Sequence, residues 1–187
     1  MRCFIGIPLP DSYQKIMAEL IENWKNRLNS KITWTRFGNW HLTLYFFFNL
    51  DQEQLKNIES ALAEVKMEKF AFQSKGGGFF PGPKKPRVIW VGLQKGADKS
   101  SELASRVLSS LQPLGYEPDK RPFAAHLTLG RIKQARQDNW GELLYYLNNL
   151  DWPEINIDKF VLWKSELSQK GPTYTVLQEY HLQKGNE

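Results

Sequence analysis

The tetrapeptide His-Leu-Thr-Leu occurs twice in this chain, at residues 41–44 and 126–129. The two copies are 85 positions apart, and the same offset relates the segments 2–9 and 87–94 that precede them. A repeat that keeps its distance to a preceding strand indicates an internal duplication. We therefore expect an α+β fold of two pseudo-symmetric lobes, each of which presents its motif strand to a shared central cleft.

Hydrophobic periodicity predicts the same order of elements in both halves: strand, helix, motif strand, helix, strands. We expect antiparallel sheets that line the cleft, with helices outside. Asp51 is placed to cap the second helix, and Asp11 or Ser12 the first. The segment 76–86, rich in glycine and proline, is the natural hinge between the lobes of a single domain, 1–187. The expected strands are 2–9, 31–36, 40–48, 70–74, 87–93, 125–132, 155–167 and 174–182, the last two around a Gly171-Pro172 turn, and the expected helices are 13–28, one after Asp51, 98–111 and 139–150.

Each motif places an imidazole and a hydroxyl on one face of a strand. Residues i and i+2 of a strand point to the same side about 6.6 Å apart, so His41 lies beside Thr43, and His126 beside Thr128. Imidazole titrates at about pH 6.5, and two facing imidazoles can serve as acid and base in one reaction. With threonine hydroxyls to hold phosphate oxygens, this set suits phosphodiester hydrolysis without a metal or cofactor.

Two other interpretations of the motifs stay open. A single copy is best explained as a strand with a polar outer face, but two copies at matched positions favour a shared site. A zinc site is the weaker alternative, because two histidines lack a third or fourth ligand at suitable spacing. The third histidine, His181, has no threonine two positions on, and we expect it to be structural or exposed.

Arginines near the motifs are candidate ligands for a phosphate. Arg131 stands five positions after His126 and would face away from it on a regular strand, unless a bulge at Gly130 turns it back. Arg121 and Arg36 are near enough in sequence to reach the cleft. For each arginine alone, a solvated charge is the simpler explanation.

A second basic group stands beside aromatic residues. In one interpretation, the basic side chains bind the RNA backbone while bases stack on the aromatic rings. In the other, they form an exposed basic loop beside aromatic residues of the core. The members of this group are Lys84, Lys85, Arg87, Phe79, Phe80 and Trp90.

Composition fits a cytoplasmic monomer with an anionic partner. The formal net charge is +5, which favours nucleic acid or phosphate esters. Cys3 is the sole cysteine, which excludes an internal disulfide and suits a reducing compartment. We expect it to be a strand residue rather than a nucleophile. No apolar run approaches the ~18 residues of a membrane span, and the apolar run at 4–7 is too short for a signal peptide.

Paired His-x-Thr-x motifs on duplicated lobes resemble those of the 2H phosphoesterase superfamily. Within it, the chain is most similar to the RNA 2′,3′-cyclic phosphodiesterases, also called 2′-5′ RNA ligases. The likeness covers nearly the whole chain. Besides the motifs it includes segments 2–8, 78–81, 86–92, 121–131 and 165–167, with Tyr174.

This resemblance implies that the protein opens a 2′,3′-cyclic phosphate at an RNA end to a 2′-phosphomonoester without a metal, and that reverse 2′-5′ ligation is accessible in vitro. By the family's assignment, His41 is the proton donor to the leaving oxygen and His126 is the proton acceptor that activates water. Thr43 and Thr128 bind the phosphate. The near-symmetry of the motifs does not by itself orient the two histidines.

The chain departs from the family pattern in three places. Phe-Gly-Asn-Trp stands at 37–40, where the family often has Pro-Glu-Asn-Leu, and Phe-Phe-Phe at 46–48, where it usually has Phe-Leu-Gly. Ala124 replaces a basic residue two positions before the second histidine. These changes alter the rim of the cleft and leave the catalytic set complete.

The same residues allow two other functions. One is a phosphodiesterase for free cyclic nucleotides or 2′-5′-linked oligonucleotides, and the other is a module that binds RNA ends without significant turnover. The presence of both histidines and both threonines favours an enzyme over the binding module.

Overall fold

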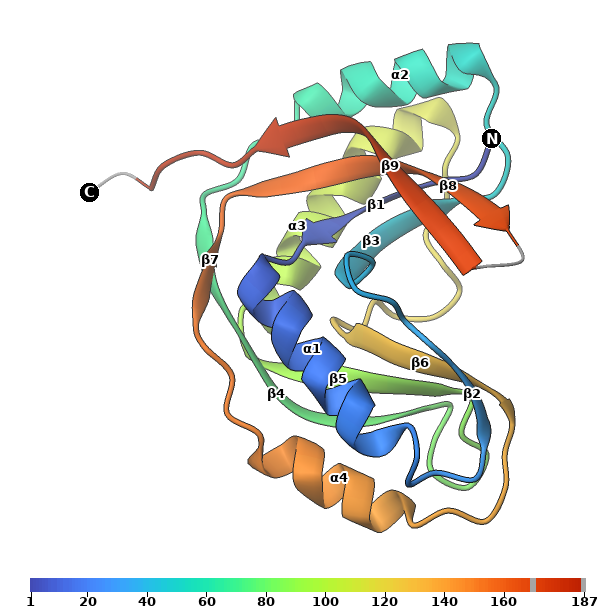
Figure 1. The fold of residues 1–187 in the computed structure, drawn as a ribbon. Helices are drawn as coiled ribbons and strands as arrows, with labels where there is room; N and C mark the ends of the chain where they lie inside the picture. The colour runs from blue at the N-terminus through green and yellow to red at the C-terminus, as the bar shows by residue number, and fades with distance from the viewer. Residues whose placement is uncertain (169–170, 186–187) are drawn as a thin grey trace.

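Two antiparallel sheets form the centre of the molecule, one above the other in Figure 1. The computed structural model describes residues 1–168 and 171–185. The sheet that carries His41, called here the His41 sheet, has the order β3-β1-β8-β9, and the His126 sheet has the order β2-β6-β5-β4-β7. Their strands are β1 (Cys3–Pro8), β3 (His41–Phe47), β8 (Lys159–Ser168), β9 (Gly171–His181), β2 (Lys31–Trp34), β6 (Leu127–Gln134), β5 (Val88–Lys95), β4 (Phe70–Phe80) and β7 (Ile155–Ile157).

Each sheet takes strands from both halves of the chain. β8, from the second half, pairs with β1 of the first, and β4, from the first half, pairs with β5 of the second. All neighbouring strands of the two sheets are antiparallel. The predicted two-lobe α+β architecture is confirmed, but each lobe is assembled by an exchange of strands rather than from one half of the sequence.

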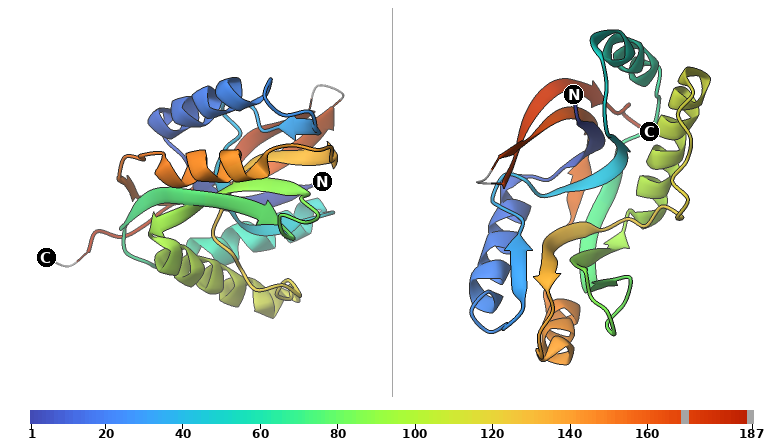
Figure 2. Two further views of the ribbon diagram at one scale, coloured as in Figure 1. Left: turned by 90° about the horizontal axis from the view of Figure 1, so that it is seen from below. Right: turned by 90° about the vertical axis from the view of Figure 1, so that its right-hand side faces the viewer.

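Each sheet is also covered by a helix from each half of the chain. α1 (Asp11–Trp24) packs on the His126 sheet, where the Tyr13 ring lies 5.9 Å from that of Phe72, and it contacts α4 (Trp140–Asn149) through Trp24 and Tyr146. α2 (Gln52–Ala63) and α3 (Ala97–Leu111) cover the His41 sheet, and a short 3-10 turn, Gln112–Leu114, follows α3 (Figure 2).

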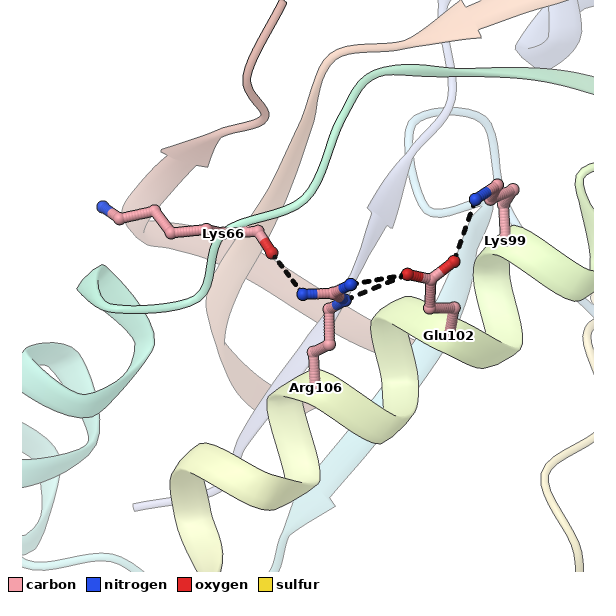
Figure 3. A network of polar contacts seen from close by, with 4 residues as sticks. All are labelled: Lys66, Lys99, Glu102 and Arg106. Carbon is pink, nitrogen blue, oxygen red and sulfur yellow. Dashed lines mark hydrogen bonds and ion pairs between the residues drawn. The ribbon is translucent and has the colours of Figure 1, made fainter. Parts of the chain in front are cut away.

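A polar network on the surface joins α3 to the chain that follows α2. Arg106 donates to the Glu102 carboxylate at 2.7 Å and to the Lys66 carbonyl at 3.0 Å, and Lys99 donates to the other Glu102 oxygen at 3.0 Å (Figure 3). These side chains are exposed, so water and salt screen the ion pairs and they contribute little to stability. The network fixes the position of the connection more than it stabilises the fold.

The predicted helix caps are right for α2 and wrong for α1. Asp51 accepts from the Gln54 N–H, and the Gln54 side chain accepts from the Asp51 N–H, which completes a capping box. Helix α1 begins instead after Pro10, whose carbonyl accepts from the N–H groups of Tyr13 and Gln14. Proline already holds the extended conformation that an N-cap requires, and Asp11 falls inside the first turn.

The glycine-rich segment is a strand and not a hinge, so the prediction that the lobes join near 76–86 is wrong. Residues 76–80 continue β4, which is the hydrogen-bonded neighbour of β5, and the turn between them is confined to 81–87. A Cβ on Gly78 would stand 2.4 Å from Cζ2 of Trp90, and one on Gly77 would stand 2.5 Å from Cδ1 of Leu147. The glycines therefore make room for neighbouring side chains within a sheet.

Cys3, His181 and the Gly171-Pro172 pair each have a predicted place in the fold. Cys3 is buried in β1, where burial raises the pKa of its thiol, and His181 is exposed in β9. Gly171 and Pro172, expected to form a turn, belong to β9, while residues 169 and 170 before them lie outside the described residues. Within the described part of the chain, no helix is long and apolar enough to cross a membrane.

We expect Gly78→Ala to lower the free energy of unfolding by roughly 1–3 kcal/mol, because the rigid Trp90 ring must move to admit a methyl group. Gly82→Ala is the matched control, since nothing lies within 4 Å of the added Cβ, and it should change stability by less than ~0.5 kcal/mol. Chemical denaturation measures both, and equal losses would contradict the packing role of Gly78.

Candidate active site

The two motif strands, β3 and β6, contact each other although they belong to different sheets. His41 is the first residue of β3, and His126 directly precedes β6. Both side chains are half-buried, and the charge on His126 is close enough to lower the pKa of His41. The structure therefore brings the two predicted imidazoles to one place, where the lobes meet.

A hydrogen bond fixes the orientation of each imidazole. Nδ1 of His41 donates to the Asn39 carbonyl at 2.8 Å, and Nδ1 of His126 donates to the Ala124 carbonyl at 2.7 Å. Because a carbonyl only accepts, each Nδ1 carries the hydrogen, and each Nε2 is left to exchange a proton with a ligand. Ala124 contributes its backbone carbonyl here, so the bond does not depend on the side chain at this position.

Burial controls the protonation of the pair. It lowers the pKa of His41 from 6.5 to about 4, and it also lowers the pKa of His126. The His41 ring is stacked on Phe4 at 4.5 Å, with Tyr174 edge-on at 5.4 Å and Trp163 at 5.6 Å. In this apolar setting the charged form of imidazole is disfavoured, so both histidines are neutral near pH 7 without a ligand.

The close contact around His41 depends on a residue without a side chain. A Cβ on Gly6 would stand 2.6 Å from the Leu42 carbonyl, 3.3 Å from the Trp163 ring and 3.4 Å from Cδ2 of His41. Gly6 therefore allows the imidazole and the indole to lie over β1.

The two threonine hydroxyls are available to a ligand. Thr43 is exposed and Thr128 is half-buried, and within the described residues neither hydroxyl makes a hydrogen bond. The backbone of Thr128 is fixed, because its carbonyl accepts from the Thr35 hydroxyl at 2.9 Å. Each motif thus offers one free Nε2 and one free hydroxyl on the same face.

A bulge is present at Gly130, the one condition under which the sequence allowed Arg131 to face the site. Gly130 pairs with Ile89, and Thr128 pairs with the next residue, Trp90, so β6 has one residue more than β5 at this point. The bulge turns Arg131 to the face of the second motif. Its positive charge lowers the pKa of both histidines, which places it beside the site.

The first motif has a matching bulge. Tyr45 pairs with Ile5, and Thr43 pairs with the next residue, Gly6. Phe46 consequently occupies the position in the first copy that Arg131 occupies in the second, 85 residues later. The two halves of the site have the same backbone but a different side chain at this position.

The remaining basic candidates lie further out. Arg121 is exposed in the loop before β6, where its backbone N–H donates to Asp119. The Arg36 guanidinium lies near the start of β9, 3.5 Å from where a Cβ on Gly171 would stand. Lys84, Lys85 and Arg87 are exposed at the β4–β5 turn.

The aromatic residues near that turn separate into two groups. Phe79 is buried in the core against Trp140, whereas Phe80 stacks on Trp90 at 5.2 Å and lies edge-on to His126 at 4.9 Å. Within the described residues, no three His, Cys, Asp or Glu side chains gather as metal ligands.

Sequence reasoning missed Gln14, which positions the first motif. This side chain, 5% exposed on α1, accepts from the Gly38 N–H at 3.0 Å and donates to the Trp40 carbonyl at 2.9 Å. It therefore holds both residues that flank Asn39, whose carbonyl orients His41. A glutamine on the apolar face of an amphipathic helix was the available signal.

One repeated family accounts for both copies of the motif. The LigT like Phosphoesterase family matches residues 7–90 and again residues 91–174. The chain belongs to this family. The two matches meet inside β5, which confirms the duplication, and the resemblance to the 2H phosphoesterases is confirmed with it.

Individual relatives agree with this membership. An RNA 2′,3′-cyclic phosphodiesterase of Thermotoga maritima is 32% identical over 99% of this chain and 97% of its own length. The crystal structure of TT0787 of Thermus thermophilus has a TM-score of 0.83 at 26% identity and covers both chains completely. The structure of E. coli LigT complexed with 3′-AMP shares the fold, with a TM-score of 0.75 at 21% identity and 97% of each chain covered.

We expect Gln14→Met to free the loop before His41, because the Gly38 N–H and the Trp40 carbonyl would lose a buried partner. In the natural protein at neutral pH, nitrogen NMR shifts should show Nδ1–H and an unprotonated Nε2 for both histidines. In the variant, His41 should show a mixture of tautomers while His126 is unchanged. An unchanged His41 tautomer would contradict the positioning role of Gln14.

Proposed function

We propose that this protein opens 2′,3′-cyclic phosphates at RNA ends to 2′-phosphomonoesters, with His41 and His126 as acid and base. The observation that carries the proposal is the pair of imidazoles with free Nε2 atoms, each beside a free threonine hydroxyl, on two strands in contact. The relative from Thermotoga maritima is named an RNA 2′,3′-cyclic phosphodiesterase, and that name states the same reaction.

The reaction needs two proton transfers around one phosphorus atom. Nε2 of neutral His126 takes a proton from water, and the water oxygen bonds to phosphorus. The bond from phosphorus to the 3′-oxygen breaks, and Nε2 of protonated His41 gives its proton to that oxygen. The product carries a 2′-phosphate and a free 3′-hydroxyl. This orientation of the roles follows the family assignment. A 2′-5′ ligation is the same step with the 5′-hydroxyl of a second RNA in place of water: its oxygen bonds to phosphorus as the bond to the 3′-oxygen breaks.

The other residues stabilise the charge on the phosphoryl group. The hydroxyls of Thr43 and Thr128 donate to its non-bridging oxygens, and Arg131 adds a positive charge from the second motif. Both histidines are neutral without a ligand, so the one that acts as the acid becomes protonated when substrate binds. The bound phosphodiester anion stabilises the imidazolium form and raises the pKa of that histidine.

The test is hydrolysis of RNA that ends in a 2′,3′-cyclic phosphate, in the presence of EDTA. We expect a 2′-phosphate product, and a loss of kcat/KM of at least ~100-fold in either His41→Ala or His126→Ala, because each removes one proton transfer. His181→Ala, at an exposed histidine of β9, is the control and should retain full activity.

Three outcomes would contradict this proposal. Activity that survives both active-site substitutions would exclude the paired histidines, and activity abolished by EDTA would require a metal. Tight RNA binding without any product would make the protein an RNA-end binding module. Preferential turnover of free cyclic nucleotides or 2′-5′-linked oligonucleotides would keep the mechanism and change the substrate.

The lowered histidine pKa values predict the pH dependence. One imidazole must be protonated and the other neutral, so the rate falls below the lower pKa and above the higher one, whichever histidine is the acid. Because burial lowers both pKa values in the free protein, the maximum of kcat/KM should lie below pH 6.5. The maximum of kcat should lie at higher pH, since the bound anion raises both pKa values. A flat profile in steady-state kinetics would contradict this.

A further inference from the structure

An exposed aromatic surface continues from the first motif to the end of its strand. β3 is an edge strand of the His41 sheet. Phe46 follows Thr43 along it, and Phe48 comes directly after its last residue. Phe48 is 76% exposed, while Phe46 is half-buried, and their ring centroids lie 5.2 Å apart. The mechanism proposed above uses neither ring.

Phe4 links this surface to the reacting imidazole. Its ring is nearly parallel to that of Phe46, at 6.2 Å with an interplanar angle of 6°, and it is stacked on His41 at 4.5 Å. Aromatic rings therefore lie in contact from His41, through Phe4 and Phe46, to Phe48 in solvent. Phe4 itself is buried, so Phe46 and Phe48 are the members of this row beyond His41 that a ligand can reach.

A positive charge accompanies the exposed rings. The Arg2 guanidinium lies over the Phe46 ring, 5.5 Å from its centroid, and Arg2 is exposed. Among the described residues it has no acidic partner within ion-pair distance. Exposed rings with an unneutralised cation are the elements with which proteins bind single-stranded nucleic acid, since bases stack on the rings and the cation attracts the backbone.

The two halves of the site differ in a way that orients such a ligand. At equivalent positions, the second motif has Arg131 and the first has Phe46. The side chain near His126 suits the anionic phosphoryl group, and the side chain near His41 suits a base. The attached strand would therefore leave the site over β3.

We propose that Arg2, Phe46 and Phe48, together called the Phe48 platform, bind the RNA strand just before its reacting end. Phe48 stacks on a base upstream of the terminal nucleotide, and Arg2 faces the phosphate backbone. This inference rests on the proposed function and adds a binding site to it: the protein prefers oligonucleotides to mononucleotides.

The experiment compares a mononucleotide 2′,3′-cyclic phosphate with a short oligonucleotide that has the same end. The natural protein should show the higher kcat/KM on the oligonucleotide. Phe48→Ala should lower kcat/KM on the oligonucleotide on the order of tenfold, the effect of one lost base stack, and leave the mononucleotide unchanged. Because Phe48 is exposed, the variant should fold normally.

Control variants separate stacking from general surface effects. Phe48→Trp should retain the preference, whereas Phe48→Leu, which keeps the apolar character without a ring, should lose it. Tyr145→Ala removes an aromatic residue that is 72% exposed on α4 and should change neither substrate. Arg2→Ala should reduce the dependence of oligonucleotide binding on salt, because one phosphate contact is lost.

An abasic scan of the oligonucleotide completes the test. In the natural protein, one abasic position should lower kcat/KM more than the others. The same abasic position should have no further effect in Phe48→Ala, because the Phe48 ring and the missing base are the two partners of one contact. Equal kcat/KM of the natural protein on both substrates, or an equal loss on both in Phe48→Ala, would overturn the platform while the proposed function stands. Failure of the natural protein to hydrolyse either substrate would overturn both.

Discussion

The active site depends on the pairing of strands from opposite halves of the chain. β8 pairs with β1, and β4 pairs with β5, so each sheet is complete only when both halves are folded. These pairings fix the two sheets relative to each other, and the two motif strands, β3 and β6, are in contact. The imidazoles lie at that contact, and their separation is therefore set by backbone hydrogen bonds in both sheets rather than by a flexible connection.

The sequence predicted the local features of this arrangement better than its long-range ones. Identical motifs at a constant offset predicted that two histidines and two threonines share one cleft, while the bulge that turns Arg131 to the same face was only left open by the glycine after the second motif. The exchange of strands could not be predicted, because periodicity shows that a strand exists but not which strand it pairs with. Gly77 and Gly78 were misread for the same reason: what makes them strand residues is Leu147 and Trp90, which reach them only in the folded protein.

The duplication has kept the backbone of the site alike while its side chains have diverged. Both imidazoles donate to the carbonyl two residues earlier, and both motif strands carry a bulge after the threonine. The surroundings differ: His41 lies among Phe4, Trp163 and Tyr174, and His126 has the edge of Phe80 and the charge of Arg131 nearby. Acid and base roles can be distinct in such a site because burial and charge differ between two otherwise equal groups.

The exchange also means that one copy of the repeat cannot build the site alone. The first copy of the repeat supplies β1 and β3 to one sheet and β2 and β4 to the other, and neither sheet is complete without the second copy. Two separate copies would complete both sheets by trading their last strands around a twofold axis, as symmetric dimers do. Separate copies of the repeat could therefore form such a site only as a strand-swapped pair, with one histidine from each copy. Within one chain the two halves of the site need not be identical, and one position accordingly holds Arg131 in one half and Phe46 in the other.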